Sequence, residues 1–380
     1  MTTATIMAGI PAINLSLFHR VRFNVGDPTA YAAFDDGTSL FICRDIELHR
    51  ARQSARASAC ACPADFSPAS GLSAERETAT AQALAEALVR RGITRAIADR
   101  SFPLLFAEHV RARGIVLELD ADLGVLDRRR KDETELAALQ EAQSVTEAAM
   151  EMACTTIARA SPRADGVLIC DGAPLTAARV NTMIDIFFLE RGYTTPGSIV
   201  ACGHHGSDCH HRGEGDLKTG QPIIVDIFPT SRATRYSGDC TRTLVHGDVP
   251  DAIAHMHSVV KAAKAAGISA TRAGVTADSV YRAALAEIER GGFARAPLPE
   301  HPPADFCSLQ HGLGHGIGLE VHEAPLVDAG GPALIAGDVF TVEPGLYHAT
   351  LGGVRIEDIV VVTETGSRNL NRLHEELDWS

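Results

Sequence analysis

Short apolar runs alternate with polar, helix-favouring segments through the first third of the chain. Two of these runs, 31–34 and 40–43, flank the sequence Asp-Asp-Gly, which is typical of a β-hairpin turn. A segment rich in Ala, Glu and Leu covers 73–91 and stops at Gly92, which predicts a helix. Two more apolar runs enclose a second helix-like segment; in chain order these are 96–98, 102–113 and 115–119. Because strands and helices alternate, we expect a small α/β domain with an at least partly parallel sheet.

A run of charged residues at 127–132 separates this region from the remainder of the chain. We interpret the run as a solvent-exposed connector and place a domain boundary near residue 130. Asp132-Glu-Thr-Glu135 has the pattern of a capping box, so a helix is expected from there to about residue 160. Its buried face would be formed by apolar residues spaced three or four apart: Leu136, Leu139, Ala142, Val145 and Ala149.

The region after residue 130 repeats a plan of two helices followed by strands. The helices are predicted at 134–160, 174–191, 251–266 (ending before Gly267) and 276–290 (ending before Gly291). The first pair precedes strands that carry Asp226 and Asp239, and the second pair precedes strands that carry His315, Glu343 and Glu357. Two related halves that face each other would bring these side chains onto one central site.

Composition limits the kinds of binding partner and the cellular compartment that we expect for the protein. The 380 residues carry a formal net charge of −13, with 45% hydrophobic and 22% charged residues. This acidic balance argues against binding to nucleic acid or anionic membrane surfaces, and the apolar stretches are too short to span a membrane. Residues 1–16 lack a basic region ahead of their apolar residues, so a signal peptide is not expected. The nine cysteines, among them an isolated Cys60-x-Cys62, are expected to be reduced and mostly buried thiols of a cytoplasmic protein.

Five side chains that bind hard metal ions lie in strand or turn contexts of the C-terminal region: Asp226, Asp239, His315, Glu343 and Glu357. One imidazole among four carboxylates makes an oxygen-rich donor set. Such a set favours Mn, Co, Fe or Mg-like ions, with zinc possible, over a thiolate-bound structural zinc. Because carboxylates can bridge, these side chains suffice to hold two ions about 3.5–4 Å apart with one shared water.

The sequence around three of these donors suits a buried site. Asp226 ends an apolar run and Asp239 begins one, and the residues between them allow the two strands to fold back together. Each aspartate alone is also compatible with an exposed turn. Two buried carboxylates would raise each other's pKa unless a cation lies between them. His315 lies between His311 and His322 among interleaved glycines, which permit close approach of the backbone.

The two glutamates lie in β-rich sequence. Glu343 closes an apolar strand that Pro-Gly then stops. Glu357 lies in the run 354–362, where strand alternation would place Arg355, Glu357 and Ile359 on one face. A carboxylate there is costly to bury unless it is paired or bound to a metal ion, so an ion pair with Arg355 is the alternative to a ligand role.

Taken in this order, the segments resemble the pita-bread metallopeptidases: aminopeptidase P, prolidase and methionine aminopeptidase, with creatinase as a metal-free relative. The resemblance rests on the donor order Asp, Asp, His, Glu, Glu and on the segments Gly-His315-Gly-Ile-Gly-Leu-Glu-Val-His322-Glu and Val-Glu343-Pro-Gly. The spacing from Asp226 to Asp239 is slightly longer than in many members. The resemblance implies an α/β (α+β) fold, with a creatinase-like N-terminal domain over 1–130 and a pita-bread catalytic domain with a pseudo-two-fold repeat over 131–380.

The resemblance also implies a role for each donor. Asp226 would bind one metal ion, His315 and Glu343 would bind the other, and Asp239 and Glu357 would bridge both. A hydroxide between the ions would be the nucleophile, and Glu343 would accept and return its proton. The two divalent ions are expected to be Mn, with Co, Zn or Fe as alternatives.

Further residues take roles from the same resemblance. His322 would hydrogen-bond the substrate carbonyl or the developing oxyanion. A substrate-facing histidine is expected ahead of the first aspartate, and His210 fits it better than the alternative, His211. Arg355 would support Glu357 from behind.

The implied function is hydrolysis of Xaa-Pro bonds at the N-terminus of short proline-containing peptides, by an Xaa-Pro aminopeptidase or Xaa-Pro dipeptidase that forms a homodimer. Two alternatives stay open, a creatinase-like C–N hydrolase and a catalytically inactive pita-bread interaction protein. Both alternatives predict that metal ligands have been replaced, whereas all five stand in this sequence.

Overall fold

The computed structural model describes residues 2–380, which divide between Arg128 and Arg129 into two compact units. The assignment of residues 1–130 and 131–380 to an N-terminal and a catalytic domain stays a prediction. No helix within the described residues is both long enough and apolar enough to cross a membrane. All nine cysteines are free thiols, as expected, although only four of them are fully buried.

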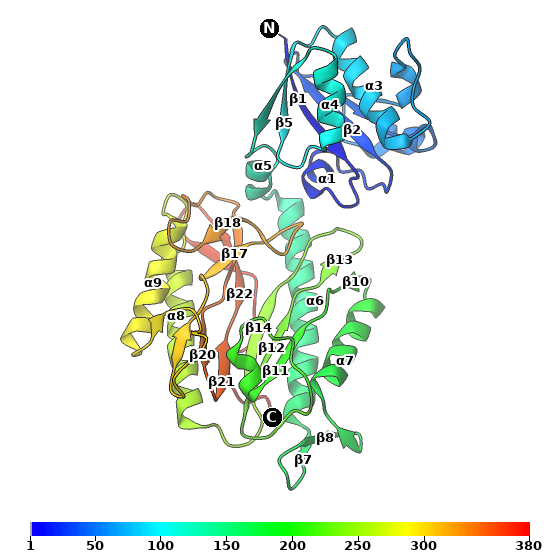
Figure 1. Ribbon diagram of the computed structural model, residues 1–380. Helices are drawn as coiled ribbons and strands as arrows, with labels where there is room; N and C mark the ends of the chain where they lie inside the picture. Colours follow the sequence, from blue (N-terminus) through cyan, green and yellow to red (C-terminus); the bar gives the residue numbers. More distant parts are fainter. Residues whose placement is uncertain (1) are drawn as a thin grey trace. The chain divides into compact units, whose positions relative to one another are not determined.

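A six-stranded sheet forms the centre of the first unit (Figure 1). In their order across the sheet, the strands are β4 (Ala59–Ala61), β3 (Ser39–Ile42), β2 (Thr29–Phe34), β1 (Thr3–Gly9), β5 (Arg95–Asp99) and β6 (Val116–Asp120). Strands β2 and β3 pair antiparallel, which confirms the predicted hairpin. The pairs β3–β4, β1–β5 and β5–β6 are parallel, so the sheet is partly parallel, as expected.

Alternate residues of β1 face two separate hydrophobic cores. Ile6 packs in one core with Leu84 and Phe106, whereas Met7 packs in another with Leu17 and Phe41. The helical segments of this region are α1 (Leu15–Val21), η1 (Asp45–Glu47), α2 (Leu48–Ser54), η2 (Pro63–Phe66), α3 (Arg76–Arg90), α4 (Leu104–Ala112) and α5 (Val125–Arg129). Because β1 exposes one face to each core, helices cover both sides of the sheet.

The charged run at 127–132 is not the exposed connector that its composition suggested. Arg129 is 7% exposed and its guanidinium lies 2.6 Å from Asp338. Lys131 is equally buried, and its ammonium lies 2.6 Å from Glu323. Both carboxylates come from more than 190 positions further along the chain, so the local sequence gave no sign that these cations would be paired and buried.

Four long helices frame the second unit: α6 (Glu133–Ala158), α7 (Ala177–Glu190), α8 (Asp251–Ala270) and α9 (Ala277–Arg290). The predicted capping box starts α6, because Asp132 and Glu135 each accept a hydrogen bond from the other's backbone N–H at 2.9 Å. The prediction that α8 ends before Gly267 is wrong. A Cβ at Gly267 would lie 3.1 Å from Leu313 and 3.2 Å from Val342, so this glycine allows close packing of the helix on a sheet.

The strands of the second unit form three larger sheets and two small ones. The first half contains β11 (Ile199–Cys202), β12 (Pro222–Ile227) and β14 (Cys240–Val245), with the short 3₁₀ helix η3 (Gly203–Ser207) after β11. One sheet of the second half contains β15 (Ala294–Arg295), β16 (Cys307–Leu309), β20 (Gly345–His348) and β21 (Gly352–Arg355). The other contains β18 (Glu323–Val327), β17 (Gly314–Gly316), β19 (Val339–Val342), β22 (Asp358–Val362) and β23 (Ser367–Asn369). The small sheets consist of β7 (Ser161–Pro162), β8 (Leu168–Cys170) and β9 (Ala173–Pro174), and of β10 (Tyr193–Thr194) with β13 (Thr230–Ser231).

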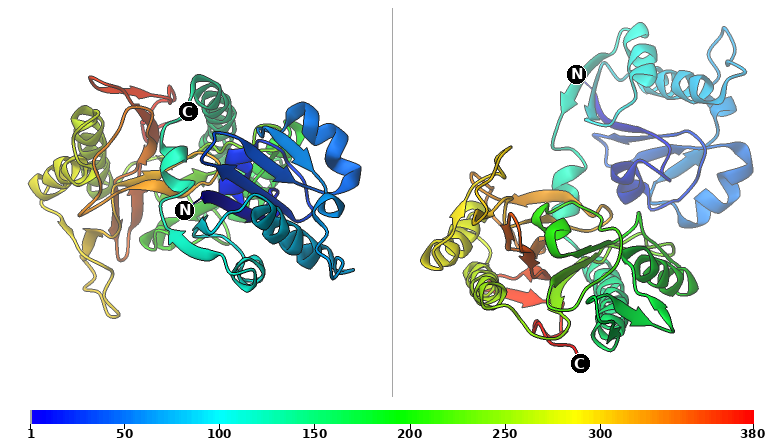
Figure 2. Two further views of the ribbon diagram at one scale, coloured as in Figure 1. Left: turned by 90° about the horizontal axis from the view of Figure 1, so that it is seen from above. Right: turned by 60° about the horizontal axis from the view of Figure 1, so that its bottom comes forward.

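The two halves of this unit follow the same plan. Helices α6 and α7 pack on the β11–β12–β14 sheet through a core that includes Ile184 and Val225. Helices α8 and α9 pack on the strands of the second half through a core that includes Val260 and Phe340. Figures 1 and 2 show the two helix pairs on opposite sides with the larger sheets between them. The predicted repeat of two helices followed by strands is therefore present, and it leaves the strands of both halves facing one centre.

Candidate metal centre

Two aspartates reach the centre from neighbouring strands of the first half. Strands β12 and β14 pair antiparallel, with Asp226 opposite Thr241 and Ile227 opposite Cys240. Asp239 directly precedes Cys240, so it lies beside the end of β12. The predicted folding back of these strands is confirmed, and both aspartates are buried, at 8% and 3% exposure.

Helix α6 fixes the backbone that carries Asp239. The Gln143 amide donates to the Asp239 carbonyl at 2.8 Å and accepts from the Asp239 N–H at 2.9 Å. A Cβ at Gly238 would overlap the Thr146 hydroxyl and lie 2.9 Å from the Ala142 carbonyl oxygen. The residue before Asp239 must therefore be small, because any side chain there would push the strand away from the helix.

His315 and Glu343 come from adjacent strands of the second half. His315 lies in β17, and Glu343 directly follows β19. The Thr341 hydroxyl accepts from the His315 N–H at 3.1 Å and donates to the Glu343 carboxylate at 3.3 Å, which ties the two residues together. A Cβ at Gly314 or Gly316 would collide with a neighbouring backbone carbonyl, so the expected close approach around His315 is confirmed.

The donors of the two halves converge on one another. The His315 Nε2 atom lies 3.3 Å from Glu343 Oε1 and 3.8 Å from Asp239 Oδ2. Donor atoms of Asp239, His315 and Glu357 all lie within 4.8 Å of one another. Side chains at this spacing can share a metal ion with little rearrangement.

Glu357 lies where a strand passes from one sheet to another. The sequence predicted one strand over 354–362, but β21 ends at Arg355 and pairs with β20, whereas β22 begins at Asp358 and pairs with β19. Glu357 lies between the two, and its N–H donates to the Thr241 carbonyl at 3.1 Å. The Thr241 hydroxyl also donates to the Glu357 carboxylate at 2.8 Å. Simple strand alternation therefore does not apply at this position.

Arg355 makes its direct ion pair with a carboxylate that was not predicted, and its indirect support of Glu357 stays a prediction. Its Nη2 atom lies 2.6 Å from Asp226 Oδ2, so its direct ion pair is with Asp226 and not with Glu357. It approaches Glu357 only through Thr241, whose hydroxyl accepts from Arg355 Nε at 3.3 Å. The pairing depends on β12 and β21 lying side by side, which the local sequence around Arg355 does not encode.

Sequence reasoning missed a tyrosine in this network. The Tyr347 hydroxyl lies 2.8 Å from Arg355 Nη1 and 2.7 Å from His311 Nε2, so it links the two. Tyr347 is fully buried. Thr241 was also missed, although its spacing of two from Asp239 marks the same strand face.

Burial sets the protonation behaviour of the donors. Burial and then the charge of Glu357 raise the pKa of Asp239 well above its usual range, and burial and then Glu343 do the same for Glu357. Burial also raises the pKa of Glu343, against the opposing effects of His311 and Arg355. Burial lowers the pKa of His315, which keeps its imidazole neutral. The three carboxyls would release their protons and coordinate a metal ion only when a cation lies among them.

The residues present fit divalent metal ions. Within residues 2–380, Asp226 Oδ1 is a buried oxygen with no hydrogen-bond partner, as expected of an atom reserved for a ligand. Among residues 2–380, Arg355 is the only cation that forms a direct ion pair with one of the four carboxylates. A set of four carboxylates and one neutral imidazole suits Mn, Co, Fe or Zn.

The adjacent acidic residue, Asp358, has a contrasting environment. It is buried, but it pairs with Arg242 at 2.9 Å and with Lys264, and it accepts from Asn369 at 2.8 Å. Although burial opposes the effect, Arg242 and Lys264 hold the pKa of Asp358 below its usual range. Asp358 is therefore neutralised by protein cations, whereas Glu357 next to it is not, and only Glu357 is available to a metal ion.

The donors line a cavity of about 490 Å³. Apolar side chains form part of its wall: Ile199, Phe228, Val321 and Leu326. Its two cationic residues within the described chain are Arg355 and Arg212. Arg212 is exposed, donates to the Gly197 carbonyl and carries its guanidinium 5.6 Å from the Phe228 ring.

The histidines named from the sequence separate clearly. His210 and His322 both line the cavity, and the ring of the exposed His322 lies 4.1 Å from that of His315. His211, the alternative to His210, does not line the cavity. Its ring stacks on His205 instead, at 4.5 Å and 6° between planes. The structure thus places His210 with the donors and His211 apart from them.

Comparison with known proteins agrees with this architecture. The model of metallopeptidase family M24 matches residues 137–364. Over 181 residues the chain is 40% identical to a probable dipeptidase PepE of Mycobacterium tuberculosis, covering 47% of this chain and 45% of that protein. It is 26% identical to an Xaa-Pro dipeptidase of Pyrococcus horikoshii over 286 residues, 73% of each chain. The match to PepE thus spans less than half of that relative's length.

Solved structures share the fold over nearly the whole chain. The prolidase of Pyrococcus horikoshii OT3 superposes with a TM-score of 0.77 at 21% identity, covering 99% of this chain and 95% of that one. The X-Pro aminopeptidase of Thermotoga maritima superposes with a TM-score of 0.78 at 23% identity, covering 99% and 97%. The dipeptidase PepE of Mycobacterium ulcerans is 28% identical with a TM-score of 0.73, covering 98% and 92%. The chain has the pita-bread fold predicted from its motifs, and it belongs to metallopeptidase family M24.

Proposed function

We propose that the protein is a metal-dependent peptidase that cleaves Xaa-Pro bonds at the N-terminus of short peptides. The observation that carries the proposal is the convergence of five donors from two halves of one unit on the wall of a peptide-sized cavity. Relatives named Xaa-Pro dipeptidase support the choice of substrate. We also propose that residues 131–380 are the catalytic domain, since all of these donors lie there, and that residues 1–130 are the creatinase-like domain.

The donors would hold two divalent ions, with Mn as the expected metal and Co, Zn or Fe as alternatives. Asp226 would bind one ion, and His315 and Glu343 would bind the other. Asp239 and Glu357 would bind both ions. When bound, such ions activate a water molecule as the nucleophile and polarise the scissile carbonyl. The partnerless oxygen of Asp226 and the burial of Asp239 and Glu357 support this assignment.

The chain's own residues supply proton transfer and orientation. Glu343 is held by the Thr341 hydroxyl at the cavity wall, and its raised pKa is in the direction that suits a group that accepts and returns a proton. His322 is exposed beside His315 and is placed to donate a hydrogen bond to a substrate carbonyl or to the developing oxyanion. His210 faces the same cavity. Arg355 holds Asp226 in position from behind.

The cavity wall suits a short peptide that contains proline. A tertiary Xaa-Pro amide has no N–H to be gripped, so recognition must use the shape of the ring and the groups beside it. Ile199, Phe228 and Leu326 offer apolar surface for the ring. Arg212 is the cavity cation that is not paired with a metal donor, and it would attract the C-terminal carboxylate of a dipeptide.

The test is hydrolysis by the purified protein loaded with Mn²⁺ or Co²⁺, measured on Ala-Pro, Ala-Pro-Ala, Ala-Ala and Met-Ala-Ser. We expect the proline peptides to be cleaved well above the other two. Asp239→Asn and Glu357→Gln should each abolish activity and lower metal content, because a neutral amide bridges two cations poorly. Preference for Met-Ala-Ser would favour methionine aminopeptidase chemistry, and no hydrolysis of any peptide by the loaded protein would refute the proposal.

The two alternatives, creatinase-like C–N hydrolysis and an inactive interaction protein, gain no support from the site. Each alternative predicts that metal-binding residues have been replaced, whereas all five donors are present and line the cavity. A homodimer, which rests on the resemblance to proline peptidases, and a cytoplasmic location, which rests on the unpaired cysteines, are further proposals. Light scattering of the purified protein tests the first of them.

A further inference from the structure

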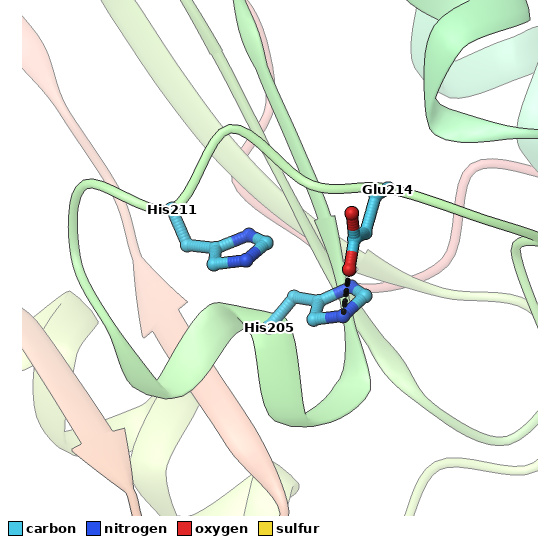
Figure 3. Close-up of side chains that lie close together, drawn as sticks. All are labelled: His205, His211 and Glu214. Carbon is cyan, nitrogen blue, oxygen red and sulfur yellow. Dashed lines mark ion pairs between the residues drawn. The ribbon is translucent and has the colours of Figure 1, made fainter.

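A second group of metal-binding side chains lies outside the cavity wall. His205 belongs to η3, and His211 and Glu214 follow in the loop that leads to β12. Figure 3 shows the three side chains gathered together. The centres of the stacked His205 and His211 rings lie 4.5 Å apart. His205 Nε2 lies 3.7 Å from Glu214 Oε1, and donor atoms of all three lie within 4.8 Å of one another. None of the three lines the cavity that holds the candidate metal centre.

We propose that His205, His211 and Glu214 form a separate binding site for one zinc ion. Two imidazoles and one carboxylate are a common zinc donor set, with a fourth position left to water. The site is rich in nitrogen, whereas the centre in the cavity is rich in oxygen. Because imidazole favours Zn²⁺ and carboxylate favours Mn²⁺, the two sites should differ in the ion that they prefer.

The backbone around these residues is already fixed. The Val200 N–H donates to the Arg212 carbonyl at 3.1 Å, and the Ala177 N–H donates to the Gly215 carbonyl at 3.0 Å. Gly213 has φ +80°, and a Cβ there would overlap the Val200 carbonyl, so the loop packs directly against β11. The donors are therefore held near one another before any ion binds, which reduces the ordering needed on binding.

Binding requires two local changes that the structure permits. The lone pairs of parallel stacked rings do not converge, so one imidazole must turn, and the Glu214 side chain, 77% exposed, has space to follow. The Gly213 N–H donates to His211 Nδ1 at 3.0 Å. Coordination through Nδ1 takes that lone pair, and coordination through Nε2 places a proton on Nδ1. Either way the Gly213 hydrogen bond is lost, which gives binding a local signature.

An ion here would also act on the proposed peptidase site, a consequence that rests on the proposed function. His210 and Arg212 lie on either side of His211 in the sequence, and both line the cavity. Zinc would tie the His211 side chain to η3 through His205 and so further restrain these two neighbours. Zinc would then position the loop, a role distinct from that of the metal ions in the cavity.

The experiment is equilibrium dialysis of the full-length, metal-free protein against Zn²⁺, followed by measurement of bound zinc. Wild type is compared with His211→Ala, Glu214→Gln and a control, His49→Ala, which removes an exposed histidine that contacts Gln53 on α2. The same variants are made with Asp239→Asn, which weakens the cavity centre. We expect His211→Ala and Glu214→Gln each to bind one zinc equivalent less than the protein without that substitution, both in wild type and in Asp239→Asn. His49→Ala should bind as much zinc as the protein without it in both backgrounds. Circular dichroism checks that each variant is folded.

Hydrogen exchange at the Gly213 amide provides the second measurement. Zinc should speed exchange there in wild type and should have no such effect in His211→Ala. Equal zinc content in wild type and His211→Ala, with an unchanged Gly213 amide, would overturn the proposal. A protein that binds this zinc but cleaves no peptide with Mn²⁺ would refute the proposed function alone. An active peptidase whose His211→Ala variant retains all its zinc would refute the second site alone.

Discussion

Removal of the buried guanidinium of Arg355 should destabilise the protein far more without metal than with it. Arg355 is 3% exposed and lies 2.6 Å from Asp226. In Arg355→Met without metal, the buried carboxyl of Asp226 would have no direct counter-ion. Breaking one side of a buried ion pair costs about 3–5 kcal/mol. With Mn²⁺ bound, Asp226 retains a cation, and the cost falls to about that of a lost charged hydrogen bond, roughly 1.5–3 kcal/mol.

The difference between the two costs, about 2 kcal/mol, is also a prediction about metal affinity. Because linkage is reciprocal, Arg355→Met should bind Mn²⁺ about 30-fold more tightly than wild type, at 1.4 kcal/mol per tenfold change. The physical reason is that the variant lacks a cation that repels the metal ions. Tighter metal binding in a less stable variant is an unusual combination, and it distinguishes this account from simple loss of packing.

Urea unfolding with and without Mn²⁺ measures both quantities. The single tryptophan, Trp379, is buried in the core of the second unit, so its fluorescence reports the unfolding of that unit. Lys264→Met is the matched control, because Lys264 is also buried but pairs with Asp358, which does not line the cavity. Its cost should be the same with and without Mn²⁺. An equal cost for Arg355→Met in the two conditions would show that Asp226 does not share its charge with a metal ion.

Three further predictions concern pH, catalysis and substrate. Because folding raises the pKa values of Asp239, Glu343 and Glu357, these three carboxyls bind more protons in the metal-free folded protein than in the unfolded chain above about pH 4. The stability that Glu357 contributes, measured by tryptophan fluorescence as the difference between wild type and Glu357→Gln, should therefore fall as pH rises from there through its raised pKa, and Mn²⁺ should restore it with release of protons; a metal-free difference that stays constant between about pH 4 and pH 7 would contradict this. His322→Ala should retain its metal, measured by elemental analysis, while kcat falls by about 10²–10³, and loss of metal would make His322 a ligand instead. Arg212→Gln should raise KM for Ala-Pro several-fold but leave KM for Ala-Pro-amide nearly unchanged, and equal effects on both substrates would exclude a contact with the carboxylate.

Several features of the protein follow from local sequence alone. Asp132 and Glu135 cap α6 because the two side chains and the two N–H groups that they accept from lie within one turn. The hairpin of β2 and β3 forms around its Asp-Asp-Gly turn for the same kind of reason. The choice of the five donors also came from sequence, because carboxylates and an imidazole in strand and glycine-rich contexts are recognisable without knowing their neighbours.

Tertiary structure decided which groups these residues meet. Arg355 pairs with Asp226, and Lys131 with Glu323, across separations that local patterns do not describe. A glycine such as Gly267 is a local signal for the end of a helix, but α8 continues through it. The glycine is there because a side chain would press against the sheet beneath the helix. The resemblance favoured His210 over His211, but that His210 lines the cavity while His211 stacks on His205 depends on how the loop folds against β11. Sequence fixes the chemistry that each side chain can offer, but its charge state and its partner depend on burial and on distant strands, and these exist only once the chain has folded.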